Sequence, residues 1–496
     1  MEVSRRDLIK MGGAACLAAG VGAAFTGCGV GRANNSGATA VVGASEVNFV
    51  EEADVLILGT GIAGLAAGMP LVKAGKKVMF VEKLPIYGGE SKISCGFMFF
   101  NGSDYQIQNG IRATVDEGWE ASKDRLTVSQ NFTESWYGDW IKRRYYGATG
   151  FINMAMKEFG ATMQKPATPE VTNLYSSMLL PDAGIDNPTS LMQPIRDGLM
   201  KAGAVFRYDT KASALIKDGD GAVIGVRCID QLSGANVDIK ASKVAICTGG
   251  FSCNQEMVAQ YLPAYAAVGN LTVNSMGEGQ LMGFAAGAKP YKMDLPAYMM
   301  GSIPQATTWG YFTPMILVTQ DGKRFINEGQ SHDSGEAALA AGFDGWWVIF
   351  DQGAWNVEQI AASVRANVAS NPERYVTATT IEDLAAGMKI NPAILAETFA
   401  KHNAMAAAGE DTEFKKTRHL RPLTGRLHAL RLSTRRYKTY GGFLTSVNCE
   451  VLDLRDNPIP NLYAAGSTVP WSTSDLSPNA GNGFMCGESI LEALRG

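Results

Sequence analysis

Histidine is scarce in this sequence, and cysteine occurs without any metal-binding pattern. Among the 496 residues there are four histidines and eight cysteines, and no two cysteines form a CxxC pair. Zinc sites and iron–sulfur clusters need grouped cysteine or histidine ligands, so no metal site is predicted. The CxxCH sequence that attaches a c-type haem is also missing. We therefore interpret the cysteines as buried free thiols.

Neither sign of charge dominates the chain. Its 44 Lys and Arg against 48 Asp and Glu give a formal net charge of −4, which lacks the basic footprint of a nucleic-acid-binding protein. Hydrophobic residues make up 46% and charged residues 19%, an ordinary balance for a globular protein. A chain of this length predicts two or three domains. What it has in excess is glycine, with 56 residues.

Residues 1–28 resemble a bacterial twin-arginine export signal. Arg5 and Arg6 in SRRDLIK precede an apolar run from Met11 to Phe25 that is too short to span a bilayer. FTGC then resembles a lipoprotein box ending at Cys28, although Phe25 stands where Leu is typical, so lipidation and soluble release both stay open. We interpret residues 29–49, rich in Gly, Ala, Asn and Ser, as a flexible linker. The protein is therefore expected at the periplasm or cell surface, with Cys28 as its one candidate membrane tether.

The segment from Asp54 to Lys83 carries a nucleotide-binding pattern. An apolar strand at 55–58 leads into GTGIAG at 59–64, a helix of small residues, a second strand at 77–81 and then Glu82. The glycines permit a tight turn that places a helix N-terminus against a pyrophosphate, and the acid accepts hydrogen bonds from a ribose. A lone GxGxxG is weak evidence, but the ordered set is specific.

Later returns to a glycine-rich edge favour FAD over a nicotinamide cofactor. A GG pair follows Glu82 within KLPIYGGES, KVAICTGGFSCN at 243–254 ends a strand in Thr-Gly-Gly, and NLYAAGSTV at 461–469 ends another at a glycine. An FAD molecule is long enough to contact all of them, whereas a nicotinamide dehydrogenase does not need the last two.

With these motifs the chain resembles the flavoproteins of the fumarate reductase and 3-ketosteroid dehydrogenase superfamily, over about residues 53–496. The markers are GTGIAG, EK-x5-GG, CTGGF, NSMGEGQLMGFAAGA at 274–288, GKRFINE at 322–328, TYGGFLT at 439–445 and LYAAG at 462–466. They are specific for the fold and for FAD, and much less specific for the substrate.

The resemblance implies an α/β protein with a Rossmann-like FAD-binding domain and an inserted α+β cap domain. The FAD-binding domain is expected at 50–293 and 427–496, and the cap at 294–426, with the substrate between them. The pattern within the insert agrees, since VTATTIEDLAAGM and NPAILAETFAKHNAMAAAG are typical of helices that begin at Thr or Asn.

The FAD contacts implied by the resemblance follow the motifs. They are Gly59, Gly61, Ala63 and Gly64 at the phosphates; Glu82 and Lys83 at the adenosine ribose; Gly89, Glu90, Ser91 and Gly96 toward the ring; Thr248, Gly249 and Gly250 near the adenosine half; and Gly442, Gly466, Ser467, Gly483 and Phe484 around the ribityl chain and ring. Glu90 and Ser467 depart from the Asn and Glu that the family commonly has. Because no sequence for a covalent flavin tether is evident, non-covalent FAD is expected.

The dicarboxylate ligands of fumarate-type members are replaced in this chain. Those members use a Gln-x-His-Pro histidine, a His-Thr-Met-Gly-Gly histidine and an arginine in Asn-Arg-Leu-Gly-Gly-Asn. Here the first segment reads DLPAYMMGSIP without histidine, Lys438 takes the second position and Pro478 the third. A buried carboxylate without partners costs several kcal/mol, so a dicarboxylate substrate is not expected.

Larger and more apolar residues occupy the substrate-facing segments. They are Tyr298, Met299, Met300, Tyr437, Tyr440 and Trp471. These side chains would suit a wide, flat pocket, and ordinary core packing remains open for each of them. The cations Arg435, Arg436 and Lys438 either hold one carboxylate or phenolate or form a solvated basic turn.

His332 is the candidate proton donor. In the family, the segment after Arg-Phe-x-Asn-Glu supplies a proton-carrying side chain, arginine in fumarate reductases and tyrosine in ketosteroid dehydrogenases. Counting from Asn327 and Glu328, that position is His332, and Asp333 follows as in the reductases. Histidine titrates near neutral pH and is a competent acid there. Lys438 and Tyr440 are the next candidates.

The predicted function is an exported FAD-dependent oxidoreductase acting on CH–CH groups. We expect reduction of an activated C=C bond in an enone or arylacrylate-like substrate, with electrons from a separate cytochrome or quinol-linked donor, as in anaerobic respiration. The alternatives are a ketosteroid-type dehydrogenase that works in the opposite direction and a flavin electron carrier without catalysis.

Overall fold

The computed structural model describes residues 41–495 apart from 95, 97, 129–136, 164–176, 180–188, 273, 296, 303–312, 330–333, 356–364, 366–367, 370 and 471–475. The described residues form two compact units. The first unit comprises residues up to 254, 273–295 and those from 440 onward, and the second comprises 255–272 and 296–439. No helix among the described residues is long and apolar enough to cross a membrane.

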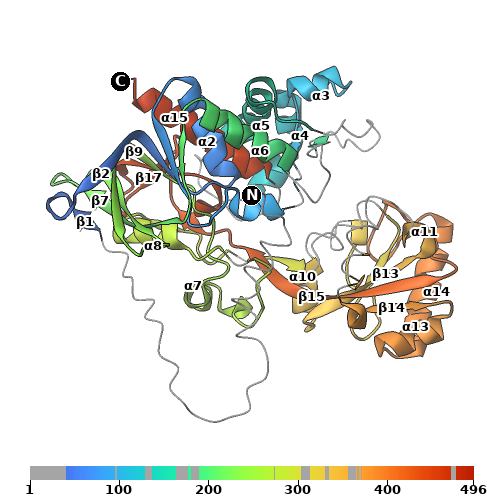
Figure 1. The fold of residues 1–496 in the computed structure, drawn as a ribbon. Coiled ribbons are helices and arrows are strands. Elements are labelled where there is room, and N and C mark those ends of the chain that lie inside the picture. The colour runs from blue at the N-terminus through green and yellow to red at the C-terminus, as the bar shows by residue number, and fades with distance from the viewer. Residues whose placement is uncertain are drawn as a thin grey trace, which may run out of the picture. The chain divides into compact units, whose positions relative to one another are not determined.

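The first unit is built on a nine-stranded sheet (Figure 1). Five neighbouring strands are parallel, in the order β18–β9–β2–β3–β6, and β7 and β8 extend the sheet in an antiparallel hairpin. The strands are β1 (Val42–Gly43), β2 (Phe49–Leu58), β3 (Val78–Val81), β6 (Val205–Arg207), β7 (Thr210–Lys217), β8 (Val223–Asp230), β9 (Asn236–Ile246), β17 (Glu450–Leu452) and β18 (Pro458–Ala464). The α/β class predicted from the sequence is confirmed.

Four helices gather beside this sheet: α2 (Ile62–Lys73), α5 (Tyr137–Phe159), α6 (Thr189–Lys201) and α15 (Ser477–Ala493) (Figure 1). Glycines let their backbones approach closely. A Cβ on Gly487 of α15 would lie 2.1 Å from the carbonyl oxygen of Ala67 in α2. A Cβ on Gly68 would lie 2.4 Å from the ring of Phe80 in β3. The small residues after the GxGxxG motif therefore hold α2 between the sheet and α15.

Shorter elements complete the first unit. They are η1 (Ala44–Glu46), η2 (Gly89–Ile93), β4 (Met98–Phe100), α3 (Asp104–Gln108), α4 (Val115–Val128), β5 (Ser177–Leu179), α8 (Glu278–Ala285), β10 (Pro290–Tyr291), β16 (Gly442–Phe443) and η8 (Gly466–Thr468).

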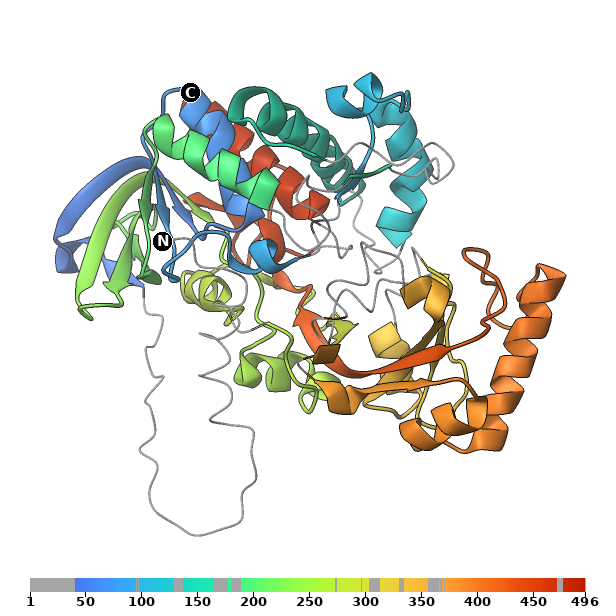
Figure 2. The ribbon, with the colours of Figure 1, turned by 45° about the vertical axis from the view of Figure 1, so that its right-hand side comes forward.

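The second unit has a five-stranded antiparallel sheet around the long strand β15 (Figure 2). Its strands are β11 (Tyr298–Gly301), β12 (Ile316–Val318), β13 (Gly345–Asp351), β14 (Tyr375–Ala378) and β15 (Leu427–Lys438). Its helices are α7 (Gln255–Tyr261), η4 (Pro263–Tyr265), α10 (Ser334–Ala340), α11 (Gln352–Trp355), η7 (Pro372–Arg374), α13 (Ile381–Met388) and α14 (Pro392–Ala408).

Alternation along β13 divides the second unit into two cores. Trp346, Val348 and Phe350 face a core shared with α10 and α11, whereas Trp347 and Ile349 face α13 and α14. Side chains of a strand alternate between faces, and here both faces are covered. The expected helix starts are present, because the side chains of Thr380 and Asn391 accept backbone N–H groups at the starts of α13 and α14.

The bounds of the second unit differ from the predicted insert of 294–426. Strand β15 continues to Lys438 and pairs with β11, β13 and β14, so residues 427–438 belong to this sheet. Arg436 also attaches the segment 255–272, donating to the Asn270 side chain (2.9 Å), the Tyr265 carbonyl (3.0 Å) and the Gln255 side chain (2.9 Å). Residues 42–49, placed in the linker from composition, instead supply β1, η1 and the start of β2.

Candidate cofactor and active site

The turn between β2 and α2 requires glycine at position 59. Gly59 has φ +99°, and a Cβ there would lie 2.5 Å from the carbonyl oxygen of Cys247. Gly64 packs under the same turn, since its Cβ would lie 2.1 Å from the carbonyl oxygen of Gly59. The turn therefore connects β2 to α2 tightly and brings the N-terminus of α2 to the carboxyl edge of the sheet.

The N-terminus of α2 is arranged to accept an anion. Gly61 caps the helix and offers no side-chain hydrogen bond, and the backbone N–H of Ile62 donates to the Ser91 hydroxyl at 3.0 Å. Ser91, predicted to follow the cofactor, thus lies at the start of α2. Free N–H groups and the helix dipole favour a phosphate at such a position.

Glu82 is buried at the end of β3 and is oriented by a neighbour. One carboxylate oxygen accepts the Thr60 backbone N–H (3.1 Å) and hydroxyl (2.6 Å), and the other accepts the Leu84 N–H (3.0 Å). The Thr60 hydroxyl also accepts the N–H of Gly88 at 3.0 Å. A carboxylate has about four acceptor positions, so capacity remains for a ribose hydroxyl. Thr60 joins the glycine turn, the acid and the following GG pair.

Lys83 is engaged within the protein. Its ammonium donates to the Asn274 carbonyl at 2.5 Å and forms an ion pair with Glu278 at 2.7 Å. Because Glu278 begins α8, Lys83 fixes the start of α8 beside the end of β3. The structure therefore gives Lys83 a positioning contact, whereas the resemblance placed it beside the ribose.

Two further glycine turns follow β9 and β18. Gly249 and Gly466 have φ of +85° and +76°, a region that favours glycine. Gly466 donates its N–H to the Asn482 side chain at 2.9 Å, and Gly483 lies against Ala63, whose carbonyl oxygen would be 2.1 Å from a Cβ at that position. The turn at 59–64, the residues after β9, Gly466 and the helix α15 from Asn482 to Gly483 are therefore held together at one edge of the sheet.

The remaining predicted cofactor residues lie around this edge. Gly89 and Gly96 have positive φ, and Glu90 lies in η2. The carbonyl oxygen of Gly250 accepts the N–H of Gly277 at 3.1 Å. Gly442 passes under η8, where a Cβ would lie 2.0 Å from the Thr468 carbonyl oxygen. Phe484 is buried in the core and packs on Gly150 of α5, so helix packing accounts for it.

Polar atoms at these turns fit a dinucleotide. Among the described residues of the turns after β9 and β18 and of the helices α8 and α15 that begin beside them, four buried side-chain oxygens have no hydrogen-bond partner: Thr248 Oγ1, Gln280 Oε1, Thr468 Oγ1 and Asn479 Oδ1. Buried polar atoms in native proteins are normally paired. FAD carries both hydroxyl donors and phosphate and carbonyl acceptors, which match this mixture of hydroxyl and amide oxygens. The residues present therefore fit FAD.

The thiols near the turns are unreactive. Burial raises the pKa of Cys247, just before Thr248, to about 12, and it raises the pKa of Cys228 to the same value. A thiol that stays protonated is a poor nucleophile and metal ligand. Cys449 and Cys486 are also free and buried, and Cys253 is partly exposed.

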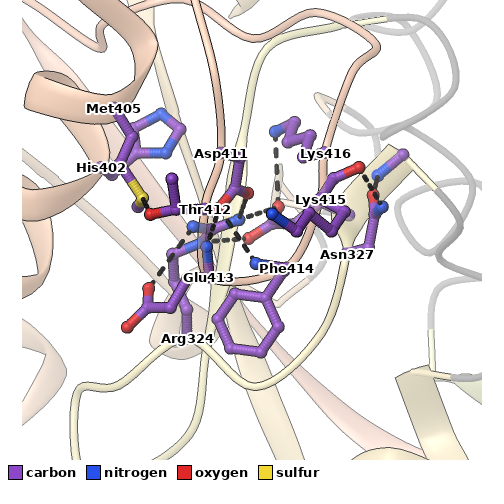
Figure 3. Close-up of polar contacts among 12 residues, drawn as sticks. Arg324, Asn327, His402, Met405, Asp411, Thr412, Glu413, Phe414, Lys415 and Lys416 are labelled. Carbon is purple, nitrogen blue, oxygen red and sulfur yellow. Dashed lines mark hydrogen bonds and ion pairs between the residues drawn. The ribbon is translucent and has the colours of Figure 1, made fainter. Parts of the chain in front are cut away.

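In the second unit, a buried charge network fixes the GKRFINE segment (Figure 3). Arg324 binds the carboxylate of Glu328 through two hydrogen bonds of 2.8 Å and Asp411 through one of 2.7 Å. Lys416 donates to the Met315 carbonyl at 2.5 Å and lies 3.5 Å from Glu328. Burial opposes the ionisation of Glu328, but Arg324 and Lys416 hold its pKa below the ordinary value. This network immobilises the residues that lead toward position 332.

Other predicted substrate residues lie on β11, on β15 or just beyond it. Met299 is fully buried, and its backbone N–H donates to Glu336 at 3.2 Å. The Lys438 ammonium is 5.8 Å from the centre of the Tyr437 ring and is mostly buried. Tyr440 is buried in the first unit. The Arg436 side chain binds the segment 255–272 through three hydrogen bonds. Of the three cations predicted to bind substrate, Arg436 therefore has a structural role. His332 and Trp471 lie outside the described residues.

Comparison with known proteins decides the family. The model of the FAD binding domain family matches residues 54–484, which is most of the chain. The chain belongs to this family of FAD-binding flavoproteins. It is therefore an FAD-dependent oxidoreductase acting on CH–CH groups, as its fumarate reductase and urocanate reductase relatives indicate.

Three of the relatives of this flavoprotein are named as reductases. A probable fumarate reductase of Shewanella frigidimarina is 26% identical over 434 residues, covering 84% of this chain and 70% of the relative. The urocanate reductase of Eggerthella lenta is 26% identical, with 84% and 69% covered. The vinyl phenol reductase of Lactiplantibacillus plantarum is 25% identical, with 86% and 92% covered.

Solved structures share the fold of the flavoprotein. A flavocytochrome c3 fumarate reductase in an open conformation has a TM-score of 0.71 at 24% identity, covering 90% of this chain and 79% of that one. The 3-ketosteroid Δ4-(5α)-dehydrogenase of Rhodococcus jostii has a TM-score of 0.69 at 23% identity, with 91% and 98% covered. The fold implied by the sequence motifs is thereby confirmed.

Sequence reasoning missed several residues that build the flavoprotein's site. Thr60, Gln280 and Asn482 join separate motifs through hydrogen bonds. Thr60 is the variable residue of the first GxG. The one feature of the sequence that could have identified it is its hydroxyl group, which can donate to the predicted ribose-binding acid Glu82. Asp411 and Lys416 gave no signal, because their partners are about 90 residues away in the sequence.

Proposed function

We propose that this flavoprotein reduces an activated C=C bond in an enone or arylacrylate-like substrate rather than in a dicarboxylate. The observation that carries the proposal is the replacement of dicarboxylate ligands, with Lys438 and Pro478 at two positions where fumarate-type members have His and Arg. A dianion would meet one cation where those enzymes supply several positive groups. An uncompensated buried charge is too costly for such binding.

The names of two relatives support a substrate in which the C=C bond lies beside a ring. One is a urocanate reductase and another a vinyl phenol reductase, both named for substrates with a C=C bond beside a ring. The vinyl phenol reductase is matched over 92% of its length. The substrate-facing segments expected from the sequence carry Met299, Tyr437 and Tyr440, and apolar and aromatic side chains suit a ring better than a second carboxylate.

The chemistry divides between the cofactor and the chain. When bound and reduced by its electron donor, FAD would supply the hydride chemistry for the β-carbon of the substrate. His332 donates the proton to the α-carbon in this proposal, because a histidine side chain ordinarily titrates near neutral pH and can serve as a general acid. Lys438 places a cation on a largely buried strand, where it stabilises the negative charge that develops on the substrate carbonyl. Tyr440 is the alternative proton donor.

We further propose that FAD binds without a covalent bond, that a twin-arginine signal exports the folded protein, and that a separate cytochrome or quinol-linked protein reduces it. The support is the absence of a flavin-tether or haem sequence and the SRRDLIK segment. A lipid attached at Cys28 would make the exported form membrane-bound.

Anaerobic reoxidation tests the function. The purified protein is reduced with dithionite and mixed with a panel containing a cyclic enone, a cinnamate-type arylacrylate and fumarate, while flavin absorbance is followed. Rapid reoxidation by an enone or arylacrylate and slow reoxidation by fumarate are expected. Fumarate reacting as fast as the best ring-bearing compound would overturn the substrate class. Reduction of oxidised flavin by a saturated ketone with an artificial acceptor would favour the dehydrogenase direction.

A further inference from the structure

Gln280 bridges two of the glycine turns. It lies in the first turn of α8 and is completely buried. Its Nε2 donates to the carbonyl oxygen of Gly249 at 2.9 Å and lies 3.5 Å from the carbonyl oxygen of Ser467. Gly249 follows β9 and Ser467 follows β18, and these strands are parallel neighbours. One amide group therefore connects the ends of two strands that are more than 200 residues apart in the sequence.

The orientation of this amide is fixed by its surroundings. Backbone carbonyls can only accept hydrogen bonds, so the nitrogen of Gln280 must face them. Its Oε1 then points away and has no partner among the described residues. Leaving a buried acceptor unpaired is destabilising, and an apolar side chain of similar length would avoid this penalty. In the FAD-free protein, the donor function of Gln280 is therefore the contact that offsets this penalty.

The bridge lies on a defined side of the site. Along the sheet edge the strands follow in the order β3, β2, β9 and β18, each about 4.8 Å from the next. Glu82 ends β3, and the N-terminus of α2 follows β2. With the adenosine ribose at Glu82 and the pyrophosphate at α2, the adenosine half is expected beside the 249 turn, and the flavin half extends toward the 467 turn after β18. Gln280 therefore joins the turns expected at the two halves of the dinucleotide.

We propose that Gln280 is a positioning residue that sets the spacing of the 249 and 467 turns and thereby determines the affinity for FAD, which contacts both turns, but not for ADP, which does not reach the 467 turn. It does so at the expense of stability in the FAD-free protein, because of the unpaired Oε1. The inference rests on the FAD site of the family and not on the proposed substrate, so each can fail without the other.

Replacement by methionine tests the bridge, because methionine keeps the length of the side chain and loses its donor. FAD affinity is measured by the fluorescence of released flavin, affinity for ADP by calorimetry, and stability by thermal unfolding of the FAD-free protein. For Gln280→Met we expect FAD affinity to fall by about 10- to 100-fold, ADP affinity to stay within about threefold, and the unfolding temperature to be unchanged or higher. Met282→Leu, a buried change in the same helix, should alter none of these.

A second variant adds a pH-dependent readout. In Gln280→Glu a protonated carboxyl can donate to Gly249, whereas the ionised form cannot, so its FAD affinity relative to the parent should be lower at pH 8 than at pH 5.5. The proposal is overturned if Gln280→Met binds FAD within about threefold of the parent. It is also overturned if FAD and ADP affinities fall equally and the FAD-free protein unfolds at a lower temperature, since that is the result of a packing role.

Discussion

Arg324 and Glu328 form a bidentate ion pair whose side chains are almost completely removed from solvent. Two parallel hydrogen bonds of 2.8 Å join guanidinium and carboxylate. Asp411 and Lys416 complete a group of two cations and two anions, so the buried charges balance (Figure 3). Removal of one member of such a group is strongly destabilising, because the charges of its partners then remain buried without compensation.

Glu328→Gln is therefore expected to lower the free energy of unfolding of the second unit by roughly 3–5 kcal/mol. The loss is measured by urea unfolding, which is monitored through the hydrogen exchange of peptides from the second unit. Glu397→Gln, which breaks an exposed pair with Lys401 at 2.8 Å, is the matched control and should leave unfolding unchanged. Equal stability of the two variants would show that the network contributes nothing.

The second unit should lose stability as the pH falls from about 6.5 to about 4. Burial, with Lys416 and Arg324 nearby, lowers the pKa of His402 to about 4, and burial lowers the pKa of His428 to about 4. Between pH 6.5 and pH 4, the histidines are protonated in the unfolded chain but stay neutral in the folded protein, so protonation favours unfolding. For His402 the loss is roughly 2–4 kcal/mol. His402→Gln should reduce the pH dependence of urea unfolding between pH 4 and 6.5. Stability at pH 8 is the reference for both proteins. The prediction is contradicted if the free energy of unfolding of the variant changes with pH as steeply as that of the parent.

Gly483→Ala should abolish FAD retention. Its Cβ would lie 2.1 Å from the carbonyl oxygen of Ala63, so α15 and α2 must separate at the start of the phosphate-binding helix. The yield of FAD-loaded protein and the flavin absorbance after purification measure the effect. Gly219→Ala is the control, because nothing lies within 4 Å of that position. Normal flavin content in Gly483→Ala would show that the close helix contact is dispensable.

His332→Ala should slow substrate reduction by about 10²- to 10⁴-fold, the usual contribution of a general acid. Flavin reduction by dithionite requires no substrate proton and should stay unchanged, which separates catalysis from damage to the FAD site. Stopped-flow reoxidation across pH 5 to 8 is the measurement. If turnover stays within a few-fold of the parent, the acid is another residue, and Tyr440→Phe and Lys438→Met are then the variants to compare.

Replacing both Arg5 and Arg6 by lysine should retain the protein in the cytoplasm, because the export route is expected to need the arginine pair. Cell fractionation with flavin fluorescence follows it. Cys28→Ser separates two forms of the exported product, since release from the membrane fraction would identify a lipid anchor. Unimpaired export of the double lysine variant would refute the twin-arginine assignment.

The sequence predicted the cofactor and fold well because their signals are local. GTGIAG and Glu82 lie within 24 residues, so the spacing of the glycines and the acid can be recognised in a short window of the sequence. The unit boundary depended instead on Arg436, whose three partners lie more than 160 residues earlier and leave no local pattern. Gln280 was missed for the same reason, since a buried amide in an apolar helix has meaning only once two distant carbonyls meet it.

The packing of Gly483 against Ala63 also bears on biosynthesis. These residues lie about 420 positions apart in the sequence, yet the cofactor site is incomplete until they meet. At roughly 5–20 residues per second, a ribosome needs about 20–80 s to add the second after the first. During that interval the nascent glycine turn has no covering helix. Flavin insertion is therefore expected to follow translation of nearly the whole chain, when FAD meets the newly completed polypeptide and not an emerging domain.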